Sequence, residues 1–165
     1  MAKDQSFDVV SQVDMQEVDN AVQQTVKEIA QRYDLKGTGS TVTFDRAGAT
    51  VALAAPSDFV LGQVKDILDG KLVRRSIDLN ALDWGKVEDA SGGSARRTAT
   101  VVNGIDAEIA RRINKEVREQ KYKVKVQIEG DKVRVFSSSR DELQNVINFI
   151  KEHDYGIPLQ FVNYR

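Results

Sequence analysis

The sequence predicts an α+β protein built from two βαββαβ modules, each a four-stranded antiparallel sheet with two helices on one face. Patterns typical of strand, helix, hairpin, helix and strand follow one another in that order, twice, within 165 residues. The hairpin glycines Gly48 and Gly130 lie 82 positions apart, and the same offset aligns Leu61 with Leu143. The composition, 41% hydrophobic and 30% charged, is that of a globular protein, so both modules are expected to fold.

The first module is expected over residues 1–84 and opens with a strand rich in β-branched residues. Asp14 then has the position of a helix N-cap, and Glu17, three residues later, completes a capping box. Alternating apolar residues on both sides of a short turn indicate a hairpin after this helix. The expected elements are a strand over 6–13, a helix from 14 to about 33, strands over 41–45 and 50–54, a helix that opens at 56–58, and a strand over 76–79.

The second module is expected over residues 96–165, after a linker over 85–95 that contains two consecutive glycines. Ser139 has the position of the N-cap of its second helix. The expected elements are a strand over 98–102, a helix over 106–119, strands over 123–128 and 132–136, a helix from 139, and a strand over 159–164. This order of elements gives each module a ferredoxin-like topology.

The net charge of −1 conceals an uneven distribution. Residues 1–60 carry five Lys or Arg against nine Asp or Glu, whereas residues 96–134 carry eleven against six. A basic segment in a nearly neutral protein is typical of a protein that binds anions. A solvated surface stabilised by salt bridges gives the same pattern, so the charge alone leaves both interpretations open.

The residue types argue against an enzyme. The chain has no cysteine, and its single histidine, His153, lies near the end of a helix, where it is expected to contact the last carbonyls. We therefore expect no catalytic residues, no metal site and no cofactor. The first residues lack the apolar stretch of a signal peptide, and no run approaches the roughly 18 apolar residues of a membrane span. A cytoplasmic protein without membrane contact is expected.

The end of the second helix carries three cations, Lys71, Arg74 and Arg75, within five positions. The helix dipole explains at least one of them, and three together also suit a phosphate group. Trp84 follows, beside the expected linker, where a lone tryptophan packs between modules or stacks on a base. A junction lined by these four side chains would clamp a compact dinucleotide.

The second module offers another candidate surface on the open face of its sheet. Strand alternation is expected to point Lys123, Lys125 and Arg134 outward, with Phe136 beside them. Cations and an aromatic ring on an open sheet suit phosphate and base contacts, as in RNA-binding modules, although the aromatic signature of the RNA-recognition motif is absent. Outward charges that merely keep a sheet soluble explain the pattern equally well.

Several segments resemble the YajQ-type family of bacterial nucleotide-binding proteins. The matching segments are Ser6–Ser11, Arg32–Gly37, Lys123–Asp131, Arg140–Gln144 and Pro158–Arg165. The resemblance covers essentially the whole chain, with one departure at Phe136–Ser139, where the family tends to carry Gly and Lys. It implies two ferredoxin-like domains that can exchange their N-terminal strands, and cytosolic nucleotide binding. Cyclic di-GMP is a ligand known within the family, and RNA binding has been suggested for it.

The sequence and the resemblance together predict a non-enzymatic nucleotide-binding protein whose Arg and Lys side chains contact phosphates, with cyclic di-GMP or another nucleotide as ligand. The alternatives are an RNA-binding module that uses the open sheet of the second domain, and a protein whose partner is another protein. The candidate binding residues are Lys71, Arg74, Arg75, Trp84, Lys123, Lys125, Arg134 and Arg140.

Overall fold

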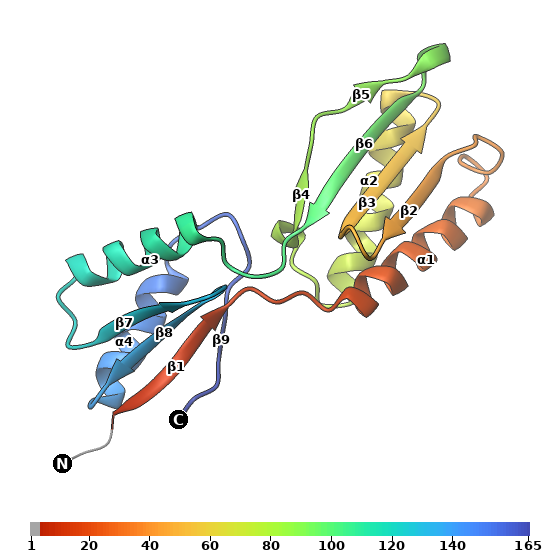
Figure 1. Ribbon diagram of the computed structural model, residues 1–165. Coiled ribbons are helices and arrows are strands. Elements are labelled where there is room, and N and C mark those ends of the chain that lie inside the picture. The colour runs from red at the N-terminus through yellow and green to blue at the C-terminus, as the bar shows by residue number, and fades with distance from the viewer. Residues whose placement is uncertain (1–3) are drawn as a thin grey trace. The chain divides into compact units, whose positions relative to one another are not determined.

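The computed structural model of the chain describes residues 4–165, which form two compact units (Figure 1). Unit 1 contains the residues up to Gln12 together with Asn103–Arg165, and unit 2 contains Val13–Val102. Unit 2 is thus inserted into the sequence of unit 1, directly after the first strand. Residues 1–3, part of the segment in which no signal peptide was expected, lie outside the described residues.

Unit 2 is a sheet with two helices packed on one of its faces. Its strands follow the order β2-β3-β6-β4, all antiparallel, and a short strand β5 pairs with β6. Val51, Leu53 and Ala55 of β3 are buried against the helices, while the residues between them are more exposed. The elements are α1 (Met15–Gln31), β2 (Thr41–Asp45), β3 (Thr50–Ala55), α2 (Asp58–Arg74), β4 (Leu82–Trp84), β5 (Glu88–Asp89) and β6 (Ala95–Val101).

Unit 1 repeats this plan with its own core. Its strands follow the order β7-β8-β1-β9, again all antiparallel. Phe7, Val9, Val133 and Val135 are fully buried in the two central strands, β1 and β8. The elements are β1 (Gln5–Val10), α3 (Ala107–Glu119), β7 (Lys125–Glu129), β8 (Lys132–Ser137), α4 (Arg140–Lys151) and β9 (Gln160–Val162).

The two modules exchange their first strands. β1 pairs with β8 and β9, and β6 pairs with β3 and β4, so each sheet has the ferredoxin-like strand order with a central strand from the other half of the sequence. The compact units therefore differ from the contiguous modules expected at 1–84 and 96–165. The expected linker over 85–95 forms part of unit 2, because Gly85 donates to the Thr98 carbonyl and β5 pairs with β6.

The helices begin where the sequence predicts. The carboxylate of Asp14 accepts hydrogen bonds from the amides of Gln16 and Glu17, and the Ser139 hydroxyl accepts one from the Glu142 amide, which confirms both N-caps. The expected capping box is wrong in one respect. The carboxylate of Glu17 contacts Arg75 and Asn20 instead of the backbone at Asp14.

The strand expected over 76–79 is absent from that segment and lies further along, at β4. Helix α2 ends in a Schellman motif, in which Ser76 has a φ of 62°. The Ser76 amide donates to the Val73 carbonyl, and the Ile77 amide donates to the Leu72 carbonyl. A short 3-10 turn over Leu79–Ala81, capped by Asp78, then leads into β4. The chain reverses after the helix, so the strand cannot start at Ser76.

No helix within residues 4–165 is both long enough and apolar enough to cross a lipid bilayer.

Replacing Phe7 with Ala tests the strand exchange. Phe7 is fully buried and its ring lies 5.9 Å from that of Phe161, so its loss is expected to cost about 3–5 kcal/mol in unit 1. Hydrogen exchange followed by mass spectrometry should show faster amide exchange in β8 while β3 keeps its protection. Leu53→Ala in β3 is the matched control and should reverse the pattern. Faster amide hydrogen exchange in β3 of the Phe7→Ala variant, with β8 unaffected, would contradict the placement of β1 in the sheet of unit 1.

Candidate functional site

Three of the candidate residues meet at the end of α2. Lys71, Arg74 and Arg75 line one hollow of about 440 Å³ together with Glu17, Gln24 and Ser76. Helical spacing produces this grouping, because Arg74 and Arg75 follow Lys71 by three and four positions and therefore lie on the same face at the end of α2. The structure therefore brings together the three cations that the sequence placed within five positions.

Two of these cations are held by carboxylates of α1. Lys71 Nζ lies 2.9 Å from Glu28, and Arg75 Nη1 lies 3.0 Å from Glu17. The hydrogen bond from Lys71 lowers the pKa of Glu28. Arg74, by contrast, is exposed and has no ion-pair partner within residues 4–165. The hollow thus presents one uncompensated guanidinium beside two cations that are fixed in place.

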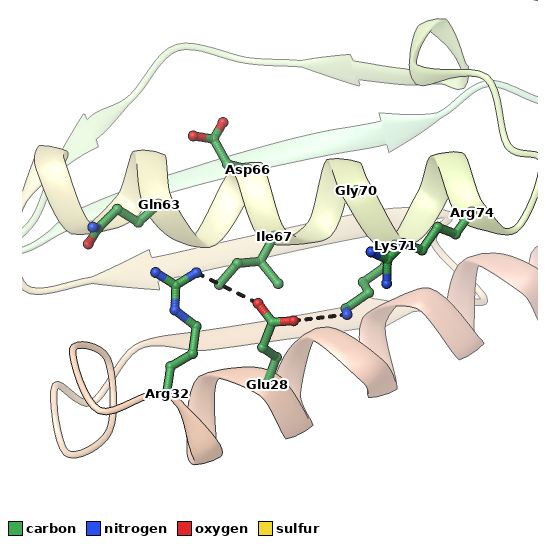
Figure 2. Close-up of a pocket in the computed structure, with 8 residues that line it drawn as sticks. All are labelled: Glu28, Arg32, Gln63, Asp66, Ile67, Gly70, Lys71 and Arg74. Atoms are coloured by element: carbon green, nitrogen blue, oxygen red, sulfur yellow. Dashed lines mark ion pairs between the residues drawn. The ribbon is translucent and has the colours of Figure 1, made fainter.

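A second hollow, of about 420 Å³, lies between α1 and α2 and shares Lys71 and Arg74 with the first (Figure 2). Figure 2 shows Glu28 between Arg32 and Lys71, with ion pairs to both. Arg32 also donates two hydrogen bonds to Asp34, of 3.0 and 2.8 Å, which fix the plane of its guanidinium group. The remaining lining residues are Gln63, Asp66, Ile67 and Gly70.

Trp84 lies apart from these hollows and lines neither of them. Its ring is partly buried and packs against the core of unit 2. Lys65 and Arg97 lie over the ring, 5.4 and 5.5 Å from its centroid, and Arg97 also donates to the Gly85 carbonyl. Two cations thus lie over the Trp84 ring, but they are Lys65 and Arg97 and not the expected cations at the end of α2.

On unit 1, the alternation of the open sheet face is as expected for β8 and for Lys125. Val133 and Val135 are buried, whereas Lys125 is exposed and pairs across the strands with Phe136. Lys123 precedes β7 and is also exposed. The side chains of both lysines make no ion pair within the described part of the chain.

Arg134 is engaged in contacts that the sequence did not reveal. Its Nε donates to the carboxylate of Asp8 at 2.8 Å, and its Nη1 lies 3.2 Å from Glu129. The Asp8 side chain is 1% exposed, and the hydrogen bond from Arg134 is the main reason that its pKa is lowered. Asp8 and Arg134 face each other in β1 and β8, so only the strand exchange brings them together. Arg134 thus forms ion pairs with two carboxylates from the neighbouring strands, Asp8 of β1 and Glu129 of β7.

Arg140 is the first residue of α4 and lines a cavity of about 520 Å³ in unit 1. Its Nε donates to the amide oxygen of Gln5 at 3.1 Å. Tyr164 and Arg165 line the same cavity, and the reasoning from sequence did not single them out. They come from the last residues of the sequence and Gln5 from the first, so no spacing along the chain indicates that they meet.

Among residues 4–165, no group of three His, Cys, Asp or Glu side chains is arranged to hold a metal ion. His153 contacts the Phe149 carbonyl through Nδ1 at 2.7 Å, which confirms its expected position at the end of a helix.

Two ferredoxin-like units that exchange their first strands place the chain in a class of small two-domain α+β proteins. The family model described as "Nucleotide-binding protein YajQ-like" matches residues 5–165, and the chain belongs to this family. A protein named "Nucleotide-binding protein" from Alkaliphilus oremlandii is 48% identical over 165 residues, which cover all of both chains. One of the same name from Geotalea uraniireducens is 51% identical over 160 residues, covering 97% of this chain and 98% of the relative.

Proposed function

We propose that this chain is a cytoplasmic protein that binds a nucleotide without transforming it, with cyclic di-GMP as the leading ligand. One observation carries the proposal. Lys71, Arg74 and Arg75 line one hollow, and Arg74 has no carboxylate partner within the described residues. The names of the relatives support nucleotides as the ligand class. The absence of cysteine and the carbonyl contact of the single histidine favour binding over catalysis.

The ion pairs of the hollow suit reversible phosphate binding. Glu17 and Glu28 hold Arg75 and Lys71 in place, so little side-chain entropy is lost when a phosphate arrives. Arg74 supplies the uncompensated charge and can donate charge-assisted hydrogen bonds to phosphate oxygens. A phosphate therefore binds mainly through Arg74 and is steadied by its neighbours.

The two adjacent hollows favour a ligand with two phosphates over one with a single phosphate. Both are lined by Lys71 and Arg74, which can serve a phosphate on either side. No aromatic side chain lines either hollow. The two hydrogen bonds to Asp34 fix the orientation of the Arg32 guanidinium, whose planar face offers a surface on which a guanine can stack. Cyclic di-GMP combines two phosphates with two guanine bases.

Arg74→Ala should weaken the binding of cyclic di-GMP at least tenfold, about 1.4 kcal/mol, in isothermal titration calorimetry. Glu17→Gln should strengthen binding several-fold, because it removes a negative charge from the hollow while the glutamine amide oxygen can still accept a hydrogen bond from Arg75. Arg118→Ala, which removes an exposed cation from α3 in unit 1, is the matched control for net charge and should leave the affinity unchanged.

An unchanged affinity of the Arg74→Ala variant for cyclic di-GMP would exclude the end of α2 as the binding site. Failure of the wild-type chain to bind any cyclic dinucleotide or mononucleotide would overturn nucleotide binding itself. A chain that binds neither nucleotides nor RNA would instead be expected to recognise another protein.

A second candidate function, RNA binding, is favoured by the cross-strand pair of Lys125 and Phe136 on the open face of unit 1. An exposed cation opposite an aromatic ring offers a phosphate contact and a stacking surface together, and Lys123 adds a second cation nearby in sequence. A strand of RNA can lie across an open sheet, whereas the hollows of α2 suit a compact ligand.

The variant Lys123→Ala/Lys125→Ala should weaken binding to single-stranded RNA in fluorescence anisotropy titrations. It should also reduce the slope of log affinity against log salt by about 1.4, since each phosphate contact on a single strand contributes about 0.7. Arg111→Ala/Lys115→Ala on α3 removes the same charge and should leave the slope unchanged. Equal slopes for the wild type and the Lys123/Lys125 variant would exclude this surface.

A further inference from the structure

The cavity at the start of α4 shares no residue with the hollows at the end of α2 and belongs to the other unit. We propose that it is a second ligand site, which binds a nucleoside monophosphate through Arg140, Arg165 and Tyr164. Its volume of about 520 Å³ lies within the range of roughly 300–1,000 Å³ typical of small-molecule sites. The inference goes beyond the proposed site on α2 and does not depend on it.

A β-bulge after β9 builds one wall of this cavity. Asp8 pairs with Val162, but Ser6 exchanges backbone hydrogen bonds with Arg165, so one strand has an extra residue between the two pairs. The extra residue is accommodated at Asn163, which has a φ of 57° and donates to Asp8 at 2.8 Å. The bulge thereby fixes Tyr164 and Arg165 beside β1 and close to α4.

Tyr164 offers a stacking surface. The residue is 65% exposed, yet the ring of the fully buried Phe7 lies 6.3 Å from the Tyr164 ring and supports it from the core side. Leu143 and Ile147 of α4 are buried beside the cavity and supply apolar surface. An exposed aromatic ring and apolar side chains that line the same cavity suit a nucleobase with its attached ribose.

The two arginines supply the phosphate contacts. Arg140 is hydrogen-bonded only to the neutral amide of Gln5, and the Arg165 side chain has no ion pair within residues 4–165. Neither guanidinium is neutralised by a carboxylate contact, in contrast to Lys71 and Arg75 at the end of α2. Asp141, which also lines the cavity, can accept hydrogen bonds from ribose hydroxyls. These side chains match the phosphate, sugar and base of a mononucleotide.

The proposal is tested by titrating the full chain with GMP, AMP and inorganic phosphate and following amide shifts by NMR. The nucleotides should shift the amides of Gln5, Gln144 and Ile147 saturably, and should bind at least tenfold more tightly than inorganic phosphate, because only they have a base to stack. Arg140→Gln and Tyr164→Leu should each weaken nucleotide binding at least tenfold. Arg118→Gln is the matched control and should not.

The same variants separate this site from the proposed site on α2. Arg74→Ala should leave mononucleotide binding at the α4 cavity intact, and Arg140→Gln should leave the response of the α2 residues to cyclic di-GMP intact. The inference is overturned if the shifts fall only on α2, if inorganic phosphate binds as tightly as the nucleotides, or if neither Arg140→Gln nor Tyr164→Leu changes the affinity.

Discussion

Asp8 lies in the middle of β1 with a side chain that is 1% exposed, and donors on both sides of the strand surround its carboxylate. Arg134 of β8 and Asn163, directly after β9, each donate at 2.8 Å, and Lys132 lies 3.8 Å away. A buried carboxylate without such partners costs several kcal/mol, so β1 is tolerated only in a position that supplies them. On the opposite face of the strand, Phe7 and Val9 supply the apolar burial. Burial of Phe7 and Val9 favours the insertion of β1 into a sheet, and the partners that Asp8 requires make this insertion specific for the sheet of unit 1.

The position of β1 determines where the cavity of unit 1 can form. Because β1 belongs to unit 1, Gln5 and Ser6 meet the start of α4 and the last residues of the chain, and together they line that cavity. The hollows at the end of α2 are instead built by α1 and α2, whose direct contact brings the carboxylates of α1 to Lys71 and Arg75. The cavity of unit 1 therefore depends on the exchange, whereas the site at the end of α2 is formed within one contiguous segment of the chain.

The sequence predicts the positions of helices and strands better than it predicts which strands pair and which side chains meet. Hydrophobic periodicity and capping residues locate each α-helix found within residues 4–165, because these signals are local, as at Asp14 and Ser139. They do not locate the short 3-10 helices. The strand after α2 was misplaced, because a Schellman motif with serine in place of glycine gives no clear signal in sequence. The grouping of Lys71, Arg74 and Arg75 follows from proximity along one helix. The contacts of Arg134 and the meeting of Arg140 with Tyr164 depend on pairing between distant strands, which no local pattern encodes.

The most direct test of this account compares the free energy of unfolding of the wild type and Asp8→Asn between pH 7 and pH 3, followed by far-UV circular dichroism in urea. Arg134 lowers the pKa of Asp8 in the folded state, so its stabilising effect is present above the unfolded value of about 3.9 and is lost as the pH falls through the lower folded value. We expect Asp8→Asn to be less stable by about 3 kcal/mol at pH 7, and the difference to shrink below about pH 4. Asp4→Asn, at an exposed position just before β1, should show no such difference. An Asp8→Asn variant as stable as the wild type at pH 7, or a difference that stays constant down to pH 3, would contradict the account.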